Sequence, residues 1–175
     1  SITNSFNGTA DASGIYPVGT TIVNWEITDI HGNVTTCATT VEVIDNEAPV
    51  VACPANITQT ADAGMCSAVV TMADLTVNDN CAIASVENDY TNTASGSDVY
   101  SVGTTTVTWT ITDIHGNITI CVQQITITDD EQPIIDCPSD ITQPADGGSC
   151  DAVVTVEPMV ATDNCMIASI VNDYT

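Results

Sequence analysis

The stretch GTTTVTWTITDIHGNITICVQQITIT, residues 103–128, decides the fold class. In its first half apolar side chains alternate with threonines, so that Val107 and Trp109 lie on one side of an extended chain. In its second half Ile125 and Ile127 are expected to point inward in the same way. A period of two is typical of a β-strand with one buried face. The stretch therefore predicts two long strands joined by a turn at DIHGN.

The DIHGN motif contains His115 and occurs a second time around His31, the other histidine of the chain. A histidine beside an aspartate can act as a general base pair, but a hydrolase also needs a nucleophile in a strained turn such as G-x-S-x-G, which is missing here. In a turn, Asp113 can cap through its side chain and Gly116 can adopt the left-handed conformation. Ile114 and His115 then take the central positions of a type I turn with a bulge. We predict a turn with an exposed histidine and no catalytic residue.

The recurrence of the motif reflects a repeat of the whole sequence. Trp25 corresponds to Trp109 and Pro49 to Pro133, each at an offset of 84 (109 − 25 = 84) without gaps. Proline-containing segments, DNEAP from Asp45 and DDEQP from Asp129, are the natural boundaries because proline ends strand pairing. The eight cysteines follow the same offset: Cys37, Cys53, Cys66 and Cys81 correspond to Cys121, Cys137, Cys150 and Cys165.

These boundaries divide the chain into three parts. Residues 1–44 are predicted to be the C-terminal part of one repeat, residues 45–128 a complete repeat, and residues 129–175 the N-terminal part of the next. Within the complete repeat, PVVACPANIT, CSAVVTM and CAIASVENDY are further expected strands. The predicted fold class is all-β: tandem immunoglobulin- or fibronectin-III-like antiparallel β-sandwiches with an 84-residue repeat. We expect the chain to be part of a longer tandem array.

Charge and cysteine content limit the partners and the compartment. The chain has 23 acidic residues and no lysine or arginine, a net charge of −23, so nucleic acid and anionic membranes are poor partners. No apolar run approaches the roughly 18 residues of a membrane span, which predicts no membrane insertion. Eight cysteines without zinc-site spacing favour disulfides and therefore an oxidising compartment.

Six motifs occur in order along the complete repeat: D-x-E-x-P, C-P-x-x-I-T, G-x-C-x-A-V-V-T, D-N-C, Y-x-V-G-T-T-x-V-x-W and T-D-x-x-G-N-x-x-x-C. This series resembles the hyalin repeat (HYR) family, in the tandem form found in large bacterial surface and adhesin proteins. The resemblance implies an immunoglobulin-like fold, a location outside the cell or on its surface, and adhesion without catalysis. The residues that carry it are Asp45, Glu47, Pro49, Cys53, Pro54, Gly64, Cys66, Asp79, Asn80, Cys81, Tyr100, Val102, Gly103, Asp113, Gly116, Asn117 and Cys121.

The resemblance also implies a disulfide pattern within repeats. An alternative pattern, which uses cysteines across the repeat junctions and would join adjacent domains, stays open. The implied pairs are Cys53–Cys121, Cys66–Cys81 and, by equivalence, Cys150–Cys165; the alternative pairs are Cys37–Cys53 and Cys121–Cys137.

Acidic clusters at the two junctions suggest calcium as a cofactor. Calcium prefers several carboxylate and carbonyl oxygens around one point, and a junction brings the end of one domain close to the loops of the next. Loop residues such as Asp79 and Asn80 could contribute, whereas the simpler alternative is a solvated acidic linker without an ion. The candidate ligands are Asp45, Asn46, Glu47, Asp113, Asp129, Asp130 and Glu131.

The leading functional prediction is a structural, adhesive segment of a long extracellular filament or stalk, stabilised by disulfides. Its partners are expected to be neighbouring repeats of the same polypeptide, with self-association into fibres and a glycan or surface ligand as further candidates. Two alternatives remain: a glycan- or protein-binding module that uses loops around residues 91–103, and an accessory domain of a secreted enzyme.

Overall fold

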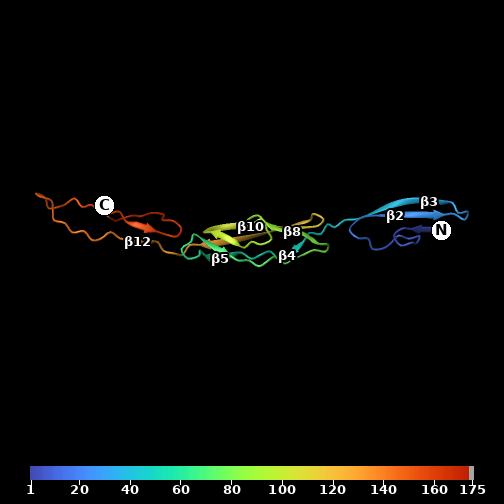
Figure 1. The fold of residues 1–175 in the computed structure, drawn as a ribbon, viewed down its shortest axis with the longest axis horizontal. Coiled ribbons are helices and arrows are strands. Elements are labelled where there is room, and N and C mark those ends of the chain that lie inside the picture. Colours follow the sequence, from blue (N-terminus) through green and yellow to red (C-terminus); the bar gives the residue numbers. More distant parts are fainter. Residues whose placement is uncertain (174–175) are drawn as a thin grey trace.

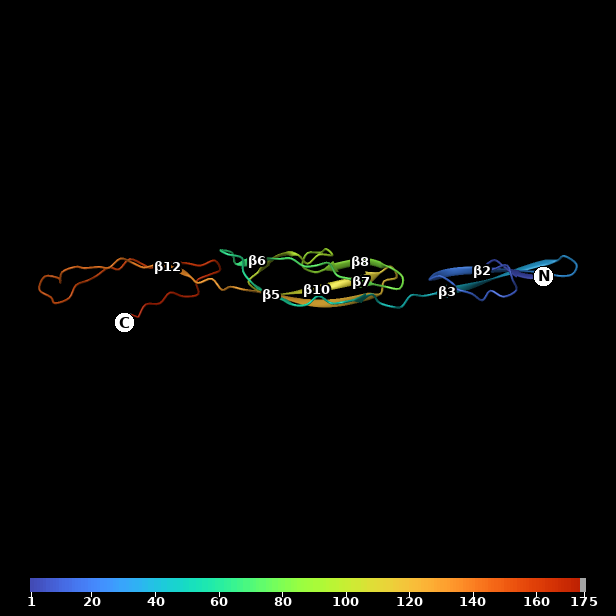
Figure 2. The same cartoon turned by 90° about the horizontal axis from the view of Figure 1, so that it is seen from below.

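Three bodies of β-structure follow one another in a line, with the N-terminal part at one end and the C-terminal part at the other (Figure 1; Figure 2). The computed structural model describes residues 1–173. In this range the chain is all-β, and none of its elements is a helix that could cross a membrane. The strands are β1 (Ile2–Asn4), β2 (Gly19–Thr28), β3 (Val34–Val43), β4 (Val50–Val51), β5 (Ile57–Thr60), β6 (Ser67–Val70), β7 (Val77–Asn78), β8 (Ile83–Asn88), β9 (Asp98–Ser101), β10 (Gly103–Asp113), β11 (Ile118–Thr128), β12 (Ile134–Asp136) and β13 (Val160–Thr162).

The middle body contains a four-stranded sheet in the order β5-β11-β10-β8. Strands β10 and β11 are the two long strands predicted from residues 103–128, and they pair antiparallel along their whole length. Strand β8 pairs antiparallel with β10, whereas β5 pairs parallel with β11. Two short antiparallel pairs, β6–β9 and β4–β7, complete the body.

The core of the middle body lies between the long strands and the β6–β9 pair. Trp109 and Ile111 of β10 and Ile125 of β11 are almost completely buried, as the alternation in the sequence predicted. Tyr100 of β9 and Val70 of β6 close the core from the other side. Full burial of one such aliphatic side chain contributes about 1.5–3 kcal/mol, so this one cluster is the main source of stability for the repeat. This packing is the two-layer arrangement expected of a β-sandwich.

Two of the expected segments fold differently in detail. The predicted strand PVVACPANIT is split into β4 and β5, because Pro54 has no N–H to donate and Cys53 is bonded to another strand. The expected loop 91–103 contains strand β9, and Tyr100 within it is buried rather than available to a ligand.

The outer bodies contain strand pairs that match pairs of the middle body. In the N-terminal part Trp25 pairs with Cys37 across β2 and β3, just as Trp109 pairs with Cys121 across β10 and β11. In the C-terminal part β12 pairs with β13 as β4 pairs with β7, with each paired residue shifted by 84 (134 − 50 = 84). Trp25 is only half-buried, because the strands that cover Trp109 have no counterpart in the N-terminal part.

Candidate functional site

The DIHGN turn between β10 and β11 has the predicted geometry. Asp113 Oδ1 accepts hydrogen bonds from the backbone N–H groups of His115 and Asn117, both at 2.8 Å, and Asp113 Oδ2 accepts one from Asn117 Nδ2 at 2.7 Å. Gly116 has a φ of 91°, in the left-handed region that the bulge requires. Burial alone would raise the pKa of Asp113, but the hydrogen bonds from Asn117 and its neighbours lower the pKa overall.

The turn orients His115 toward the start of the repeat, which the sequence did not predict. His115 Nδ1 lies 3.0 Å from Asp45 Oδ2, and the Asp45 side chain is only 1% exposed. Asn117 Nδ2 donates to the Asp45 backbone carbonyl at 3.3 Å. His115 is an exposed residue, as predicted, but the contact of its ring with Asp45 was not predicted, and its side chain is 29% exposed compared with 76% for that of His31.

A loop before β8 adds two further groups to this place. Asp79 Oδ1 accepts a hydrogen bond from the Cys81 backbone N–H at 2.9 Å, and the Cys81 thiol is hydrogen-bonded to the Asp45 carboxylate. We call Asp45, Asp79, Cys81, Asp113 and His115 the junction cluster. Three segments that lie far apart in the sequence thus meet where the middle repeat begins.

The junction cluster contains a constellation that resembles a catalytic triad. One ligand atom each from Asp45, Cys81 and His115 lie within 4.8 Å of one another. A nucleophilic cysteine needs a lowered pKa and a base that removes its proton. Here the hydrogen bond to the Asp45 carboxylate, burial and nearby negative charge raise the pKa of Cys81 to about 11. The same hydrogen bond is the main reason that the pKa of Asp45 is lowered, although burial opposes it. This arrangement keeps the thiol protonated and does not support nucleophilic catalysis.

The junction cluster also contains three carboxylates. Oxygen atoms of Asp45, Asp79 and Asp113 lie within 4.8 Å of one another, and Asp79 Oδ2 is buried without a hydrogen-bond partner. Oxygen ligands close together are what a hard cation prefers. The structure therefore brings together two of the candidate calcium ligands, Asp45 and Asp113, with Asp79, one of the loop residues expected to contribute. Asn46 and Glu47 are exposed, and Glu47 contributes its backbone N–H to Asp45 Oδ1 at 3.2 Å.

At the second junction the predicted ligands make different contacts. Glu131 Oε1 accepts a hydrogen bond from the Gly64 backbone N–H at 2.9 Å, and Asp129 Oδ1 accepts one from Asn164 Nδ2 at 3.2 Å. Asp130 lies exposed between them. The Glu131 contact crosses to the middle body, whereas the contact between Asp129 and Asn164 lies within the C-terminal part. Among residues 1–173 these side chains belong to no group of three close metal-binding atoms.

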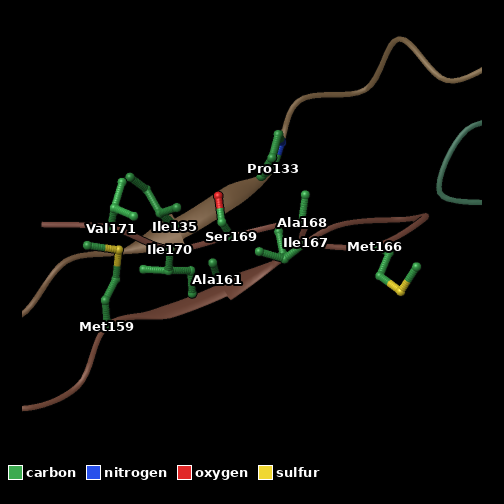
Figure 3. Close-up of a pocket in the computed structure, with 10 residues that line it drawn as sticks. All are labelled: Pro133, Ile135, Met159, Ala161, Met166, Ile167, Ala168, Ser169, Ile170 and Val171. Carbon is green, nitrogen blue, oxygen red and sulfur yellow. The ribbon is translucent and has the colours of Figure 1, made fainter.

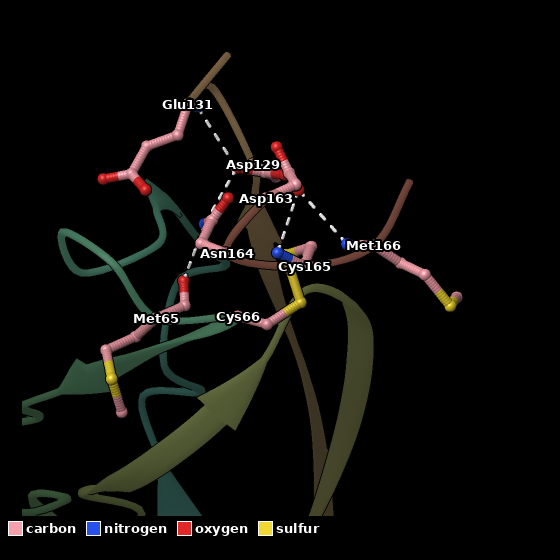
Figure 4. The surroundings of a disulfide bond; sticks show 8 residues. All are labelled: Met65, Cys66, Asp129, Glu131, Asp163, Asn164, Cys165 and Met166. Atoms are coloured by element: carbon pink, nitrogen blue, oxygen red, sulfur yellow. Dashed lines mark hydrogen bonds between the residues drawn. A yellow bond between two sulfur atoms is a disulfide. The ribbon is translucent and has the colours of Figure 1, made fainter. Parts of the chain in front are cut away.

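A disulfide crosses this second junction (Figure 4). Cys66 is bonded to Cys165, with 4.7 Å between their Cα atoms, so the expected pairs Cys66–Cys81 and Cys150–Cys165 are wrong. The physical reason is distance along the repeat. Strand β6, which begins directly after Cys66, lies at the end of the middle body that faces the C-terminal part, whereas β7 and β8, which flank Cys81, lie toward the opposite end (Figure 2).

A second disulfide closes the middle repeat. Cys53 is bonded to Cys121, with 5.5 Å between their Cα atoms, and this bond ties the segment before β5 to β11. The pair is the one that the family resemblance implied, and it excludes the alternative pairs Cys37–Cys53 and Cys121–Cys137. The cysteines with free thiols are Cys37, Cys81, Cys137 and Cys150.

Side chains of the C-terminal part line an apolar hollow (Figure 3). It is lined by Ile135, Ala161, Ile167 and Ile170, among others. At an offset of 84, the counterparts of these residues in the middle repeat are apolar side chains packed against the buried core. Those counterparts are Val51, Val77, Ile83 and Val86. The hollow thus corresponds to the face that packs against the core in the middle body.

In a comparison with models of protein families, residues 44–127 match a family model. These residues match the HYR domain. Hyalin of Lytechinus variegatus is 30% identical to this chain over 154 residues, which cover 85% of the chain and 28% of that protein. Hyalin of Strongylocentrotus purpuratus is 34% identical over 145 residues, which cover 80% of the chain and 12% of that protein. The chain thus spans less than a third of the length of these two hyalins.

Among solved structures, the ectodomain of human Desmocollin-1 aligns with a TM-score of 0.32 at 15% identity. The alignment covers 74% of this chain and 31% of that one. This similarity is too low to support an inference about the HYR-matching segment.

Proposed function

We propose that this chain is an adhesive, non-catalytic segment of a long extracellular filament or stalk made of tandem HYR repeats. The observation that carries the proposal is the Cys66–Cys165 bond, which joins two consecutive repeats covalently. The arrangement of the three bodies in a line supports an elongated assembly (Figure 1). The similarity to two hyalins supports a role of the same class.

Disulfide chemistry supports a location outside the cell, on its surface or secreted. Both disulfides, Cys53–Cys121 and Cys66–Cys165, persist in an oxidising compartment and would be reduced in the cytosol. The net charge of −23 disfavours nucleic acid and anionic membranes as partners and favours neighbouring repeats and divalent cations.

The junction cluster supports a structural role over an enzymatic one. The thiol of Cys81 has its pKa raised to about 11, the opposite of what nucleophilic catalysis requires. In the next repeat the counterpart of Cys81 is Cys165, which forms a disulfide with Cys66. The simplest interpretation is that the cysteine at this position forms a crosslink in every repeat.

Calcium at the junction cluster is part of the proposal. The observation that favours it is Asp79 Oδ2, a buried carboxylate oxygen without a partner beside the carboxylates of Asp45 and Asp113. A chain without lysine or arginine can neutralise this group only with protons, histidine or bound cations. The expected result is a higher melting temperature in millimolar calcium than in chelator, with the increase abolished by Asp79→Asn. An equal increase in the variant would contradict the site.

Binding of a glycan or protein through one loop is the weaker candidate. Residues 91–97 remain a loop, but they are held by Asn88, whose buried side-chain amide donates to Thr91 Oγ1 and to the carbonyls of Thr93 and Ser95. This bonding fixes the loop internally and leaves fewer groups for a ligand.

Adhesion is tested with beads coated with the oxidised chain. Coated beads are expected to stick to one another and to a coated surface under shear, more strongly in calcium than in chelator. Matched controls are beads coated with polyglutamate of similar charge density and beads coated with the chain carrying Cys66→Ala and Cys165→Ala. Adhesion no stronger than that of polyglutamate beads would refute an adhesive role.

A further inference from the structure

The joined junction shows which groups one repeat presents to the next (Figure 4). On one side is a loop of the middle repeat, residues 62–67, which we call the donor loop. On the other side is the receptor, made of Asp129, Asn164 and Cys165. Asn164 Nδ2 donates to the Met65 carbonyl of the donor loop at 2.9 Å, and the disulfide to Cys165 completes the contact.

A second receptor with the same geometry exists at the first junction. Asn80 Nδ2 lies 3.4 Å from Asp45 Oδ1, as Asn164 Nδ2 lies 3.2 Å from Asp129 Oδ1. The backbone N–H of Cys81 donates to Asp79 Oδ1 at 2.9 Å. In the same way the backbone N–H of Cys165 donates to Asp163 Oδ1 at 2.9 Å. The receptor at Cys81 is therefore formed before any loop occupies it.

A second donor loop, residues 146–151, is equally preformed. Its Asp146 N–H donates to the Asp151 carbonyl at 2.8 Å, which repeats the bond from Asp62 to Ser67 at 2.8 Å. Gly148 has a φ of 87° and its counterpart Gly64 one of 72°, so both loops make the same left-handed turn before their cysteine. Cys150 in this loop is exposed and has a free thiol.

We propose that Cys81 and Cys150 are the two open halves of one more inter-repeat disulfide, so that this chain binds a further repeat of its own kind at each end. The occupant of the Cys81 receptor is the donor loop of another copy, held by Asn80 and then by the covalent bond. Two thiols become one disulfide with loss of two protons and two electrons, and a disulfide oxidant such as oxidised glutathione accepts both. The proposal rests on the repeat geometry and is independent of the adhesive role.

Support comes from the chemistry of the unoccupied receptor. The receptor presents the free Cys81 thiol beside Asn80, the counterparts of Cys165 and Asn164, which hold the donor loop at the second junction. A docked loop brings Cys150 to this thiol with the geometry that joins Cys66 to Cys165. Proximity then replaces intrinsic reactivity as the reason that the bond forms.

The test uses two versions of the full chain, both carrying Cys37→Ala and Cys137→Ala. One version also carries Cys81→Ala and offers Cys150, while the other carries Cys150→Ala and offers Cys81. In oxidised glutathione the mixture is expected to form a disulfide heterodimer at least tenfold faster than either version forms a homodimer. Digestion at aspartates and mass spectrometry are expected to recover a Cys81–Cys150 peptide.

Two controls keep the outcome decisive. Asn80→Ala in the version that offers Cys81 removes the hydrogen-bond donor to the loop and is expected to slow the heterodimer without affecting the Cys53–Cys121 bond. Heterodimer and homodimers that form at equal rates, or a Cys81 that only becomes glutathionylated, would overturn the proposal. Neither result would affect the bead-adhesion test, which uses the chain with its existing disulfides.

Discussion

Removal of the Cys53–Cys121 disulfide should destabilise the middle repeat strongly. The bond closes a loop of 68 residues, and the loss of chain entropy that it imposes on the unfolded state corresponds to about 4 kcal/mol. Replacement of both cysteines by alanine avoids a free thiol and avoids a buried polar atom at Cys121, which is 2% exposed. We expect the free energy of unfolding to fall by about 2–5 kcal/mol, the usual range for a native disulfide in a small domain.

Urea unfolding followed by tryptophan fluorescence measures this loss. Trp109 is buried in the core of the middle repeat, and Trp25→Phe in all proteins removes the only other tryptophan signal. The matched control carries Cys66→Ala and Cys165→Ala. Since that bond links two bodies and does not close the middle repeat, its removal is expected to cost the repeat less than about 1 kcal/mol. A loss below about 1 kcal/mol for Cys53–Cys121, or equal losses for both bonds, would refute the reasoning.

Three further predictions concern single groups. Tyr100→Phe removes the buried hydrogen bond to the Gly96 carbonyl, 2.7 Å long, and should lower the free energy of unfolding by about 1–2 kcal/mol in the same assay; an unchanged midpoint would contradict this. The pKa of Cys81 is raised to about 11 from the ordinary 9.0, so the fraction of Cys81 thiolate at pH 8 is about a hundredfold lower than that of an ordinary cysteine. Iodoacetamide should therefore modify Cys81 slowly, and Asp45→Asn should accelerate this modification. The lowered pKa of Asp113 means that its stabilising effect is complete above the ordinary value of 3.8 and is lost as the pH falls through the lower folded value, so the urea midpoint should decrease in acid, and less steeply in Asp113→Asn.

Local pattern predicted the local structure well. The alternation around Val107 and Trp109 specified which side of β10 is buried, and the turn chemistry of Asp113 and Gly116 specified how β10 connects to β11. These features depend on residues a few positions apart, for which strand and turn preferences are strong. A proline in an apparent strand, Pro54, was the available signal that the first strand is interrupted.

The sequence did not predict which distant residues contact each other. Spacing alone cannot distinguish a bond from Cys66 to Cys81 from one to Cys165, because the choice depends on which end of the sandwich each cysteine occupies. Likewise, nothing within the DIHGN motif reveals that His115 meets Asp45, which lies 70 residues earlier. His31 occupies the equivalent place in the first DIHGN motif and is 76% exposed, so the motif alone does not indicate this contact.

The Cys53–Cys121 bond has a mechanical consequence. A pulling force that enters the repeat at Asp45 and leaves at Thr128 passes through the sulfur bridge, so the segment between the two cysteines cannot be drawn out between these points even if the sandwich unfolds. That segment would otherwise release about 240 Å of slack per repeat, at about 3.5 Å for each of its 68 residues. A filament of such repeats would lengthen little under force, because covalent bonds carry the load. A reducing agent would break the disulfides and make the same filament extensible.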